Sequence, residues 1–222
     1  MDYKTQIEDI IGAVGDDALI SKSLTNAGSK IIDATPIDKL IEASKSTDFT
    51  SSGYDVSDKK VIEVSKSGYV ARLVPSGSAS RATDSGSIHY SATRDPIFYY
   101  KGEKVFISDH TGATSGTCIY VPKIPTWDGT SAIDHSSTAV ANFPLEGEPL
   151  MVLGAAILCL QRIISDRLAT LKTYIQTDED PELAQAETYE IQGNQTLLAS
   201  LKAEYDQAFL IAAPKQQQQA QA

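Results

Sequence analysis

A long apolar stripe with the period of an α-helix lies in the last third of the chain and constrains the fold more than any other feature. Its members follow one another at steps of four, three, four, four, three and four: Leu153, Ile157, Leu160, Ile164, Leu168, Leu171 and Ile175. Residues three or four apart lie on one face of a helix, so the spacing predicts a long amphipathic helix. Residues 150–160 are apolar on every side, which predicts that both faces are covered there.

Helical patterns also occur near the N-terminus. Ile20, Leu24, Ala27 and Ile31 repeat at helical spacing. That helix should stop before Thr35-Pro36, because proline disfavours helical geometry in the residue before it. Thr35 as cap, Pro36 in the first turn and Asp38 as capping-box acid then predict a short further helix.

A last helix is expected after a break at residues 177–185. Asp180 is a natural N-cap, and Pro181 suits the first helical position. The helix should end before Pro214. The segment that follows, PKQQQQAQA, is of low complexity and is expected to be disordered.

The middle of the chain is rich in Ser, Thr, Gly and Asp between short β-type runs. Residues 60–75 alternate as a strand does, with Ser67-Gly68 as a hairpin tip. Residues 88–108 predict two strands joined by a turn at 101–103, and 117–125 predict another. The polar segments 77–87 and 110–117 have nothing to bury, so mobile loops are expected there.

Together these patterns predict an α+β fold, in which N- and C-terminal helices form a helical core and a β-rich subdomain is inserted between them. The expected parts are N-terminal helices over 1–45, the β-rich subdomain over 46–143, the long C-terminal helices over 144–213 and the tail over 214–222.

Composition excludes several classes of protein. The chain has 19 Lys and Arg against 29 Asp and Glu, a net charge of −10. Such a balance argues against binding nucleic acid by counterion release. The apolar run at 150–160 is shorter than the ~20 residues of a membrane helix. The first residues lack a basic stretch followed by an apolar one, so no secretory signal and no membrane partner are expected.

Motifs for chemistry are absent from the sequence. It has no GxxxxGK[ST], GxGxxG, HExxH or GxSxG segment. His89, His110 and His135 lack ligand spacing. Cys159 lies in the apolar helix, where a thiol packs as a small apolar group. Cys118 on a predicted strand could be reactive, but no adjacent His or basic group would lower its pKa, so core packing is favoured for both. We therefore expect no enzyme, no cofactor and no metal. A cell-wall hydrolase is the weakest hypothesis, because no nucleophile, base and carboxylate set can be assembled.

A carbohydrate- or receptor-binding module is the alternative that the aromatic residues leave open. Tyr90, Tyr99, Tyr100 and Trp127 have rings that can stack on sugars. Packing between neighbouring strands is the favoured interpretation of these rings.

The order of elements resembles the head-to-tail adaptor (connector or neck) proteins of tailed bacteriophages. Helices near the N-terminus and a β insertion precede the run FPLEGEPLMVLGAAILCLQRIISDRL at 143–168, in which a short acidic lead-in opens a long Ala- and Leu-rich helix. The phrase IIDATPIDKL at 31–40 also resembles phage virion structural proteins. The likeness covers about residues 3 to 210 and rests on the order of the elements and the composition of the segments.

The resemblance implies a non-enzymatic virion protein that forms a homo-oligomeric ring, usually dodecameric, at the portal–tail junction after assembly in the host cytoplasm. Its partners would be the portal protein, tail or nozzle proteins, and genomic DNA that passes without specific binding. Negative charge would keep DNA from adhering to the ring. The ring interface would use Leu150, Leu153, Ile157, Leu160, Ile164 and Leu168, and portal docking would use Phe209, Leu210, Ile211 and Pro214.

Overall fold

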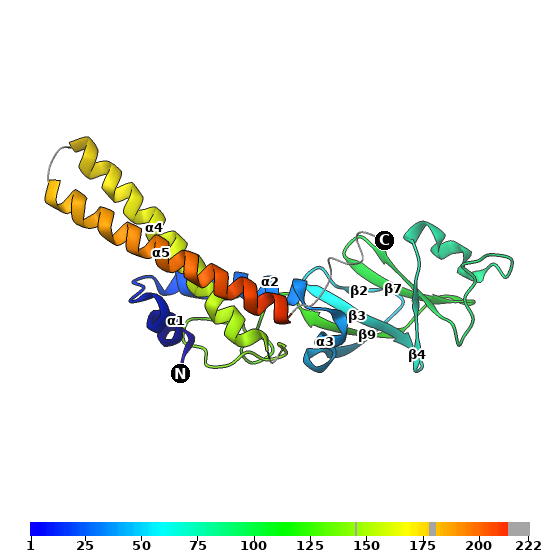
Figure 1. Ribbon diagram of the computed structural model, residues 1–222. Helices are drawn as coiled ribbons and strands as arrows, with labels where there is room; N and C mark the ends of the chain where they lie inside the picture. The colour runs from blue at the N-terminus through cyan, green and yellow to red at the C-terminus, as the bar shows by residue number, and fades with distance from the viewer. Residues whose placement is uncertain (145, 178–180, 213–222) are drawn as a thin grey trace. The chain divides into compact units, whose positions relative to one another are not determined.

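The computed structural model describes residues 1–144, 146–177 and 181–212, and its fold is α+β, as predicted (Figure 1). The chain forms two compact units. One joins Met1–Thr35 to the chain from Ile124 onward, and the other is Pro36–Lys123. The inserted unit therefore begins and ends earlier in the chain than the 46–143 expected.

The boundary lies at Ile124 because the segment after it packs with the helices. Ile133 is 2% exposed and belongs to the helical core. A Cβ on Gly28 would lie only 2.7 Å from Cγ of Pro125, so this segment also lies directly against a helix. Residues 124–143 thus serve the helical unit even though they follow the last strand.

In its described residues the helical unit contains four helices: α1 (Tyr3–Ile11), α2 (Asp17–Ala34), α4 (Gly147–Thr177) and α5 (Pro181–Ala212). Pro181 is the first residue of α5, as predicted; the Asp180 cap lies outside the described residues. Helices α2 and α4 run antiparallel. A Cβ added to Gly147 would lie 3.1 Å from the side chain of Ile31, and one added to Gly154 would lie 3.1 Å from that of Ala27, so later residues of α4 lie beside earlier residues of α2. Small residues at these positions allow the two helices to approach closely.

The apolar segment of α4 at residues 150–160 is covered by the chain's own helices. Met151, Ala155 and Cys159 are fully buried in a core that α1 and α2 share. Ile157 and Leu160 pack with Leu201 of α5. The expectation that both faces of this segment are covered is confirmed, and the coverage comes from within the helical unit.

Among the described residues, α4 is also the helix that meets a length and hydropathy criterion for crossing a membrane, between Gly147 and Ile175. In the most apolar 18-residue stretch of this helix, 56% is buried inside the fold. A core helix of this kind meets the same criterion, and the contacts with α1, α2 and α5 account for its apolar composition.

The inserted unit begins with α3 (Ile37–Leu40) and a 3₁₀ turn η1 (Ile41–Ala43) and contains two sheets. The first has the order β1 (Lys45–Phe49), β9 (Gly116–Pro122), β3 (Lys59–Lys66), β4 (Tyr69–Val70). The second has the order β2 (Tyr54–Asp55), β7 (Lys104–Asp109), β6 (Ile97–Lys101), β5 (Arg72–Leu73), with β8 (Gly112–Thr114) paired to β7. Their pairing is antiparallel except for β5 with β6.

An apolar core and one buried ion pair hold the sheets together. Val64 and Cys118 of the first sheet are buried in one cluster with Val105 and Ile107 of the second. Asp109, which is 2% exposed at the end of β7, pairs with Lys66 of β3. The predicted turns at Ser67-Gly68 and at 101–103 are confirmed, and Gly68 has the positive φ of 82° that favours glycine.

Three local predictions were wrong. The segment 77–87 contributes to a 3₁₀ helix, η2 (Ser76–Thr83), because Ala82 is fully buried against Val74 and Ile97. The segment 110–117 contains β8 and the start of β9. The Thr35 capping box does not form: α3 begins after Pro36, and the Thr35 hydroxyl donates instead to the Ile31 carbonyl at 2.7 Å.

Candidate interaction surfaces

The six residues predicted for a ring interface lie mostly inside the helical unit. Leu150, Ile157, Leu160 and Ile164 are buried, and Leu153 is half-buried against α5. Leu168 alone among the six is 45% exposed. The burial that suggested a neighbouring subunit is thus accounted for by α1, α2 and α5. The interface assignment stays a prediction, with Leu168 as the member that keeps an open surface.

The residues predicted for portal docking lie at the end of α5. The ring of Phe209 stacks on Tyr205, with centroids 5.7 Å apart, and packs against the helical core. Leu210 is 69% exposed. Ile211 belongs to α5, and Pro214 lies outside the described residues. Leu210 is therefore the one of these four whose described side chain offers apolar surface to a partner.

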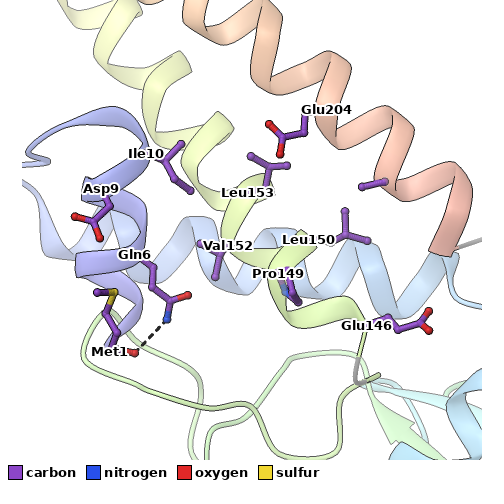
Figure 2. A pocket seen from close by; sticks show the side chains of 11 residues that line it. Met1, Gln6, Asp9, Ile10, Glu146, Pro149, Leu150, Val152, Leu153 and Glu204 are labelled. Atoms are coloured by element: carbon purple, nitrogen blue, oxygen red, sulfur yellow. Dashed lines mark hydrogen bonds between the residues drawn. The ribbon is translucent and has the colours of Figure 1, made fainter.

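A groove of about 650 Å³ lies between α1, the start of α4 and α5, and we call it the acidic groove (Figure 2). Its apolar lining comes from three helices: Ile10 of α1, Pro149, Leu150, Val152 and Leu153 of α4, and Ala208 of α5. Met1 and Gln6 complete one wall, where the Gln6 side-chain amide donates to the Met1 carbonyl at 3.1 Å.

Three carboxylates give the acidic groove its charge. Asp9 comes from α1, Glu146 from the residues just before α4, and Glu204 from α5. No Lys, Arg or His occurs among the described residues that line it. Three carboxylates outnumber the single α-amino group that Met1 contributes to the lining, so the potential over the groove is negative. The groove therefore favours a partner with an apolar face and a cation.

Buried hydrogen bonds hold α1 in place as one wall of the groove. The Tyr3 hydroxyl donates to Oε1 of Glu148 at 2.6 Å, which ties α1 to α4. Burial, and then the carboxylate of Glu148, raise the pKa of Tyr3 above its ordinary value, so the phenol stays a donor. The Tyr3 amide also donates to the Ser137 carbonyl. The groove is therefore part of a firmly packed region.

The far half of the α4–α5 hairpin is a second candidate surface. A Cβ on Gly154 of α4 would lie 3.1 Å from Cβ of Ala27 of α2, and α2 begins ten residues earlier, at Asp17. Because the two helices are antiparallel, the N-terminal end of α2 lies level with about residue 164 of α4. Beyond that level, α5 is the one described element that lies beside α4, as Figure 1 shows. Two helices cannot cover each other fully. Four large apolar side chains are consequently exposed by 45–68%: Leu168, Ile175, Leu183 and Tyr189.

An ion-pair network joins the two helices of the hairpin at this level. Nη1 of Arg167 lies 3.0 Å from Oε2 of Glu187 and also pairs with Glu190. Arg162 pairs with Asp166 one turn along α4. These pairs are partly exposed, so each contributes little to stability by itself. Their effect is to occupy the arginines of this region within the chain.

The structure does not bring the histidines and cysteines into a reactive site. Within the described ranges, no group of three His, Cys, Asp or Glu side chains could hold a metal ion. Both cysteines are free and fully buried, as predicted. Burial raises the pKa of the Cys118 thiol to about 11, and it raises that of Cys159 as well.

The aromatic residues of the carbohydrate-binding alternative belong to two separate units. Trp127 is 50% exposed in the helical unit, whereas the three tyrosines lie in the inserted unit. Tyr99 stacks on Phe106 with centroids 5.5 Å apart, and Tyr100 meets Phe98 edge-on. Tyr99 also lines a hollow of about 470 Å³ beside η2, together with the hydroxyl residues Ser76, Ser80, Thr83 and Ser108.

No pattern in the sequence predicts the acidic groove or the exposed part of the hairpin. The groove carboxylates, at positions 9, 146 and 204, are far apart in the sequence, so no local pattern joins them. The apolar stripe does mark Leu168 and Ile175, but periodicity does not distinguish a covered face from an open one. Comparison with known proteins adds no constraint, since neither a family model nor a curated protein matches the chain.

Proposed function

We propose that this chain is a structural virion protein that forms a homo-oligomeric ring between the portal protein and the tail of a tailed bacteriophage. Genomic DNA would pass through the ring without specific binding. The observation that carries the proposal is the α4–α5 hairpin, which continues past the helices that support its base and exposes apolar side chains. Apolar surface of this kind is typical of a site for contact with other chains.

The order of the elements supports the same proposal. The two ends of the chain form one helical unit, and a β-rich unit is inserted between them. Adaptors of short-tailed phages have this order, which is the basis of the resemblance. The helical unit would build the ring, and the inserted unit would contact tail or nozzle proteins.

Net charge gives the proposal a physical test. A wall of net negative charge repels the DNA backbone, so a chain of charge −10 suits a conduit for DNA. We expect acidic side chains to face the lumen of the ring. If a map of the assembled ring shows them confined to its outer rim, the explanation from charge fails.

The decisive experiment is made on purified particles. Quantitative mass spectrometry should find many copies per virion, and a cryo-electron microscopy map should show a symmetric ring at the portal–tail junction. Particles without the chain, or a junction without such a ring, would refute the proposal. Particles are the right sample because adaptors of this kind can remain monomeric until they meet the portal.

A carbohydrate-binding module is the second candidate, and the hollow lined by Tyr99 favours it. Hydroxyl groups beside an aromatic ring suit a sugar. The test is a glycan array probed with the full chain and with Tyr99→Ala. Binding that the substitution abolishes would support this function, and an array without binding would remove it.

A further inference from the structure

The acidic groove and one exposed face of the hairpin are complementary in charge, and both carry apolar surface. Leu168, Lys172 and Ile175 lie at positions i, i+4 and i+7 of α4, so they form one face, which we call the tip face. Leu168 and Ile175 are 45% and 68% exposed, and Lys172 is exposed between them. A convex apolar face with a central cation is the counterpart of an apolar groove with an anionic rim.

A chain cannot place its own tip face in its own groove. Both surfaces lie on α4, at about residues 152 and 172, and twenty residues of helix span ~30 Å. A continuous helix keeps that separation fixed. Any tip face that occupies the groove therefore belongs to another copy of the chain.

We infer that the acidic groove of one copy receives the tip face of a second copy, so that copies associate head to tail. The two contacting surfaces differ, which makes the interface heterologous. Repetition of such an interface closes a ring when the rotation between copies divides a full turn. The inference deepens the proposed function and rests on it for closure of the ring, whereas the pairing of surfaces rests on the geometry alone.

Charge singles out Lys172 as the cation of this contact. The neighbouring arginines of α4 already pair within the chain, Arg162 with Asp166 and Arg167 with Glu187. The groove offers Asp9, Glu146 and Glu204, and the chain as a whole is acidic. Lys172 is thus an exposed cation on an acidic chain, and it lies between two exposed apolar side chains, as a partner for this groove should.

Zero-length carbodiimide cross-linking tests the contact directly, because it joins a lysine to a carboxylate only where the two touch. Full-length chains labelled with ¹⁴N and ¹⁵N are mixed, cross-linked over a range of concentrations and digested. We expect mixed-isotope peptides that join Lys172 to Glu204, Asp9 or Glu146. Lys172 links found only within one chain, or spread over unrelated carboxylates, would overturn the inference.

Charge-reversal variants provide the second measurement, by sedimentation velocity. Lys172→Glu and Glu204→Lys should each weaken self-association roughly fivefold, and the double variant should restore much of it. Lys202→Glu is the matched control, because Lys202 lines a different hollow, with Lys30 and Asp206, and should change association little. Equal effects of the control and the groove variant would contradict the proposed surface.

A mixing experiment distinguishes a heterologous interface from a symmetric one. Ile175→Asp disrupts the tip face but keeps the native groove, and Glu204→Lys weakens the groove but keeps the native tip face. In a mixture, the groove of the first variant can still bind the tip face of the second. We expect the mixture to form dimers that grow no further. Circular dichroism melts of the variants should match the native chain, since both side chains are exposed.

The outcomes separate this inference from the proposed function. Absence of mixed-isotope links both at about millimolar concentration in solution and in assembled particles would overturn the inference. A virion ring that assembles normally with Lys172→Glu and Ile175→Asp would do the same and leave the proposed function intact. Head-to-tail association in solution, together with absence from virions, would support the inference and refute the proposed function.

Discussion

Replacement of Gly28 by alanine tests the close packing at the base of the helical unit. Gly28 is buried within α2, and a Cβ added there would lie 2.7 Å from Cγ of Pro125 and 3.1 Å from Sδ of Met151. The methionine can rotate away, but the pyrrolidine ring is rigid and belongs to the segment that joins the strands to α4. The added methyl group therefore has to displace that segment.

Two opposing terms set the size of the effect. Alanine is favoured over glycine in a helix interior by ~1 kcal/mol. Overpacking of a well-packed core costs ~1–3 kcal/mol. Gly193 of α5 is the matched control, because it is exposed and a Cβ there would meet nothing within 4 Å. Gly193→Ala should thus stabilise by up to ~1 kcal/mol, whereas Gly28→Ala should destabilise by ~0–2 kcal/mol.

Urea unfolding followed by Trp127 fluorescence measures both changes. Trp127 is the single tryptophan and lies in the helical unit, so its signal reports that unit even if the two units unfold separately. The helix term is common to both variants and cancels between them. The free energies of unfolding should therefore differ by ~1–3 kcal/mol. If Gly28→Ala stabilises as much as Gly193→Ala, the packing of α2 against Pro125 is refuted.

Two further predictions concern the cores of the two units. Burial alone would raise the pKa of Asp109, but hydrogen bonds from Lys66 and Thr111 outweigh it and lower the pKa from 3.8 to about 2. A carboxyl group whose pKa is lower in the folded state than in the unfolded state stabilises the fold when it is ionised. Asp109 therefore contributes ~2 kcal/mol to the free energy of unfolding above pH ~4, and this contribution is lost as the pH falls toward 2. Acid titration by near-ultraviolet circular dichroism should show a shallower loss for Asp109→Asn, and an unchanged slope would contradict this. Leu160→Ala should lower the free energy of unfolding by ~2–5 kcal/mol because Leu160 is 1% exposed, whereas Leu168→Ala should lower it by under ~1 kcal/mol because Leu168 is 45% exposed. Similar losses for the two variants in urea unfolding would refute the assignment of Leu168 to an open surface.

Local physics explains why the sequence predicted most helices and several turns. The stripe from Leu153 to Ile175 specifies one helix because its period is that of the α-helix. Pro181 suits a first helical position because it lacks an amide hydrogen, and α5 does begin there. Ser67-Gly68 forms a turn because glycine tolerates positive φ. Each of these features depends on residues close together in the chain.

Errors arose where a distant contact overrides a local preference. The segment 77–87 looks like a polar loop, but burial of Ala82 against Val74 and Ile97 organises it as η2. The error at Thr35 has a local cause instead: its hydroxyl donates back to the Ile31 carbonyl, four residues earlier, and does not cap the next helix. The unit boundary at Ile124 depends on Ile133, which enters the helical core from outside any helix.

The sequence by itself determined the α+β class, the helices at both ends and the absence of common catalytic motifs, since composition and periodicity are local properties. Only the tertiary structure decided which part of the apolar stripe is covered: the N-terminal end of α2 lies level with about residue 164 of α4, so Leu160 is buried and Leu168 is open. Only the tertiary structure brings Asp9, Glu146 and Glu204 around one groove. Coverage and charge convergence depend on where helices end beside one another, and no spacing within the sequence encodes that directly.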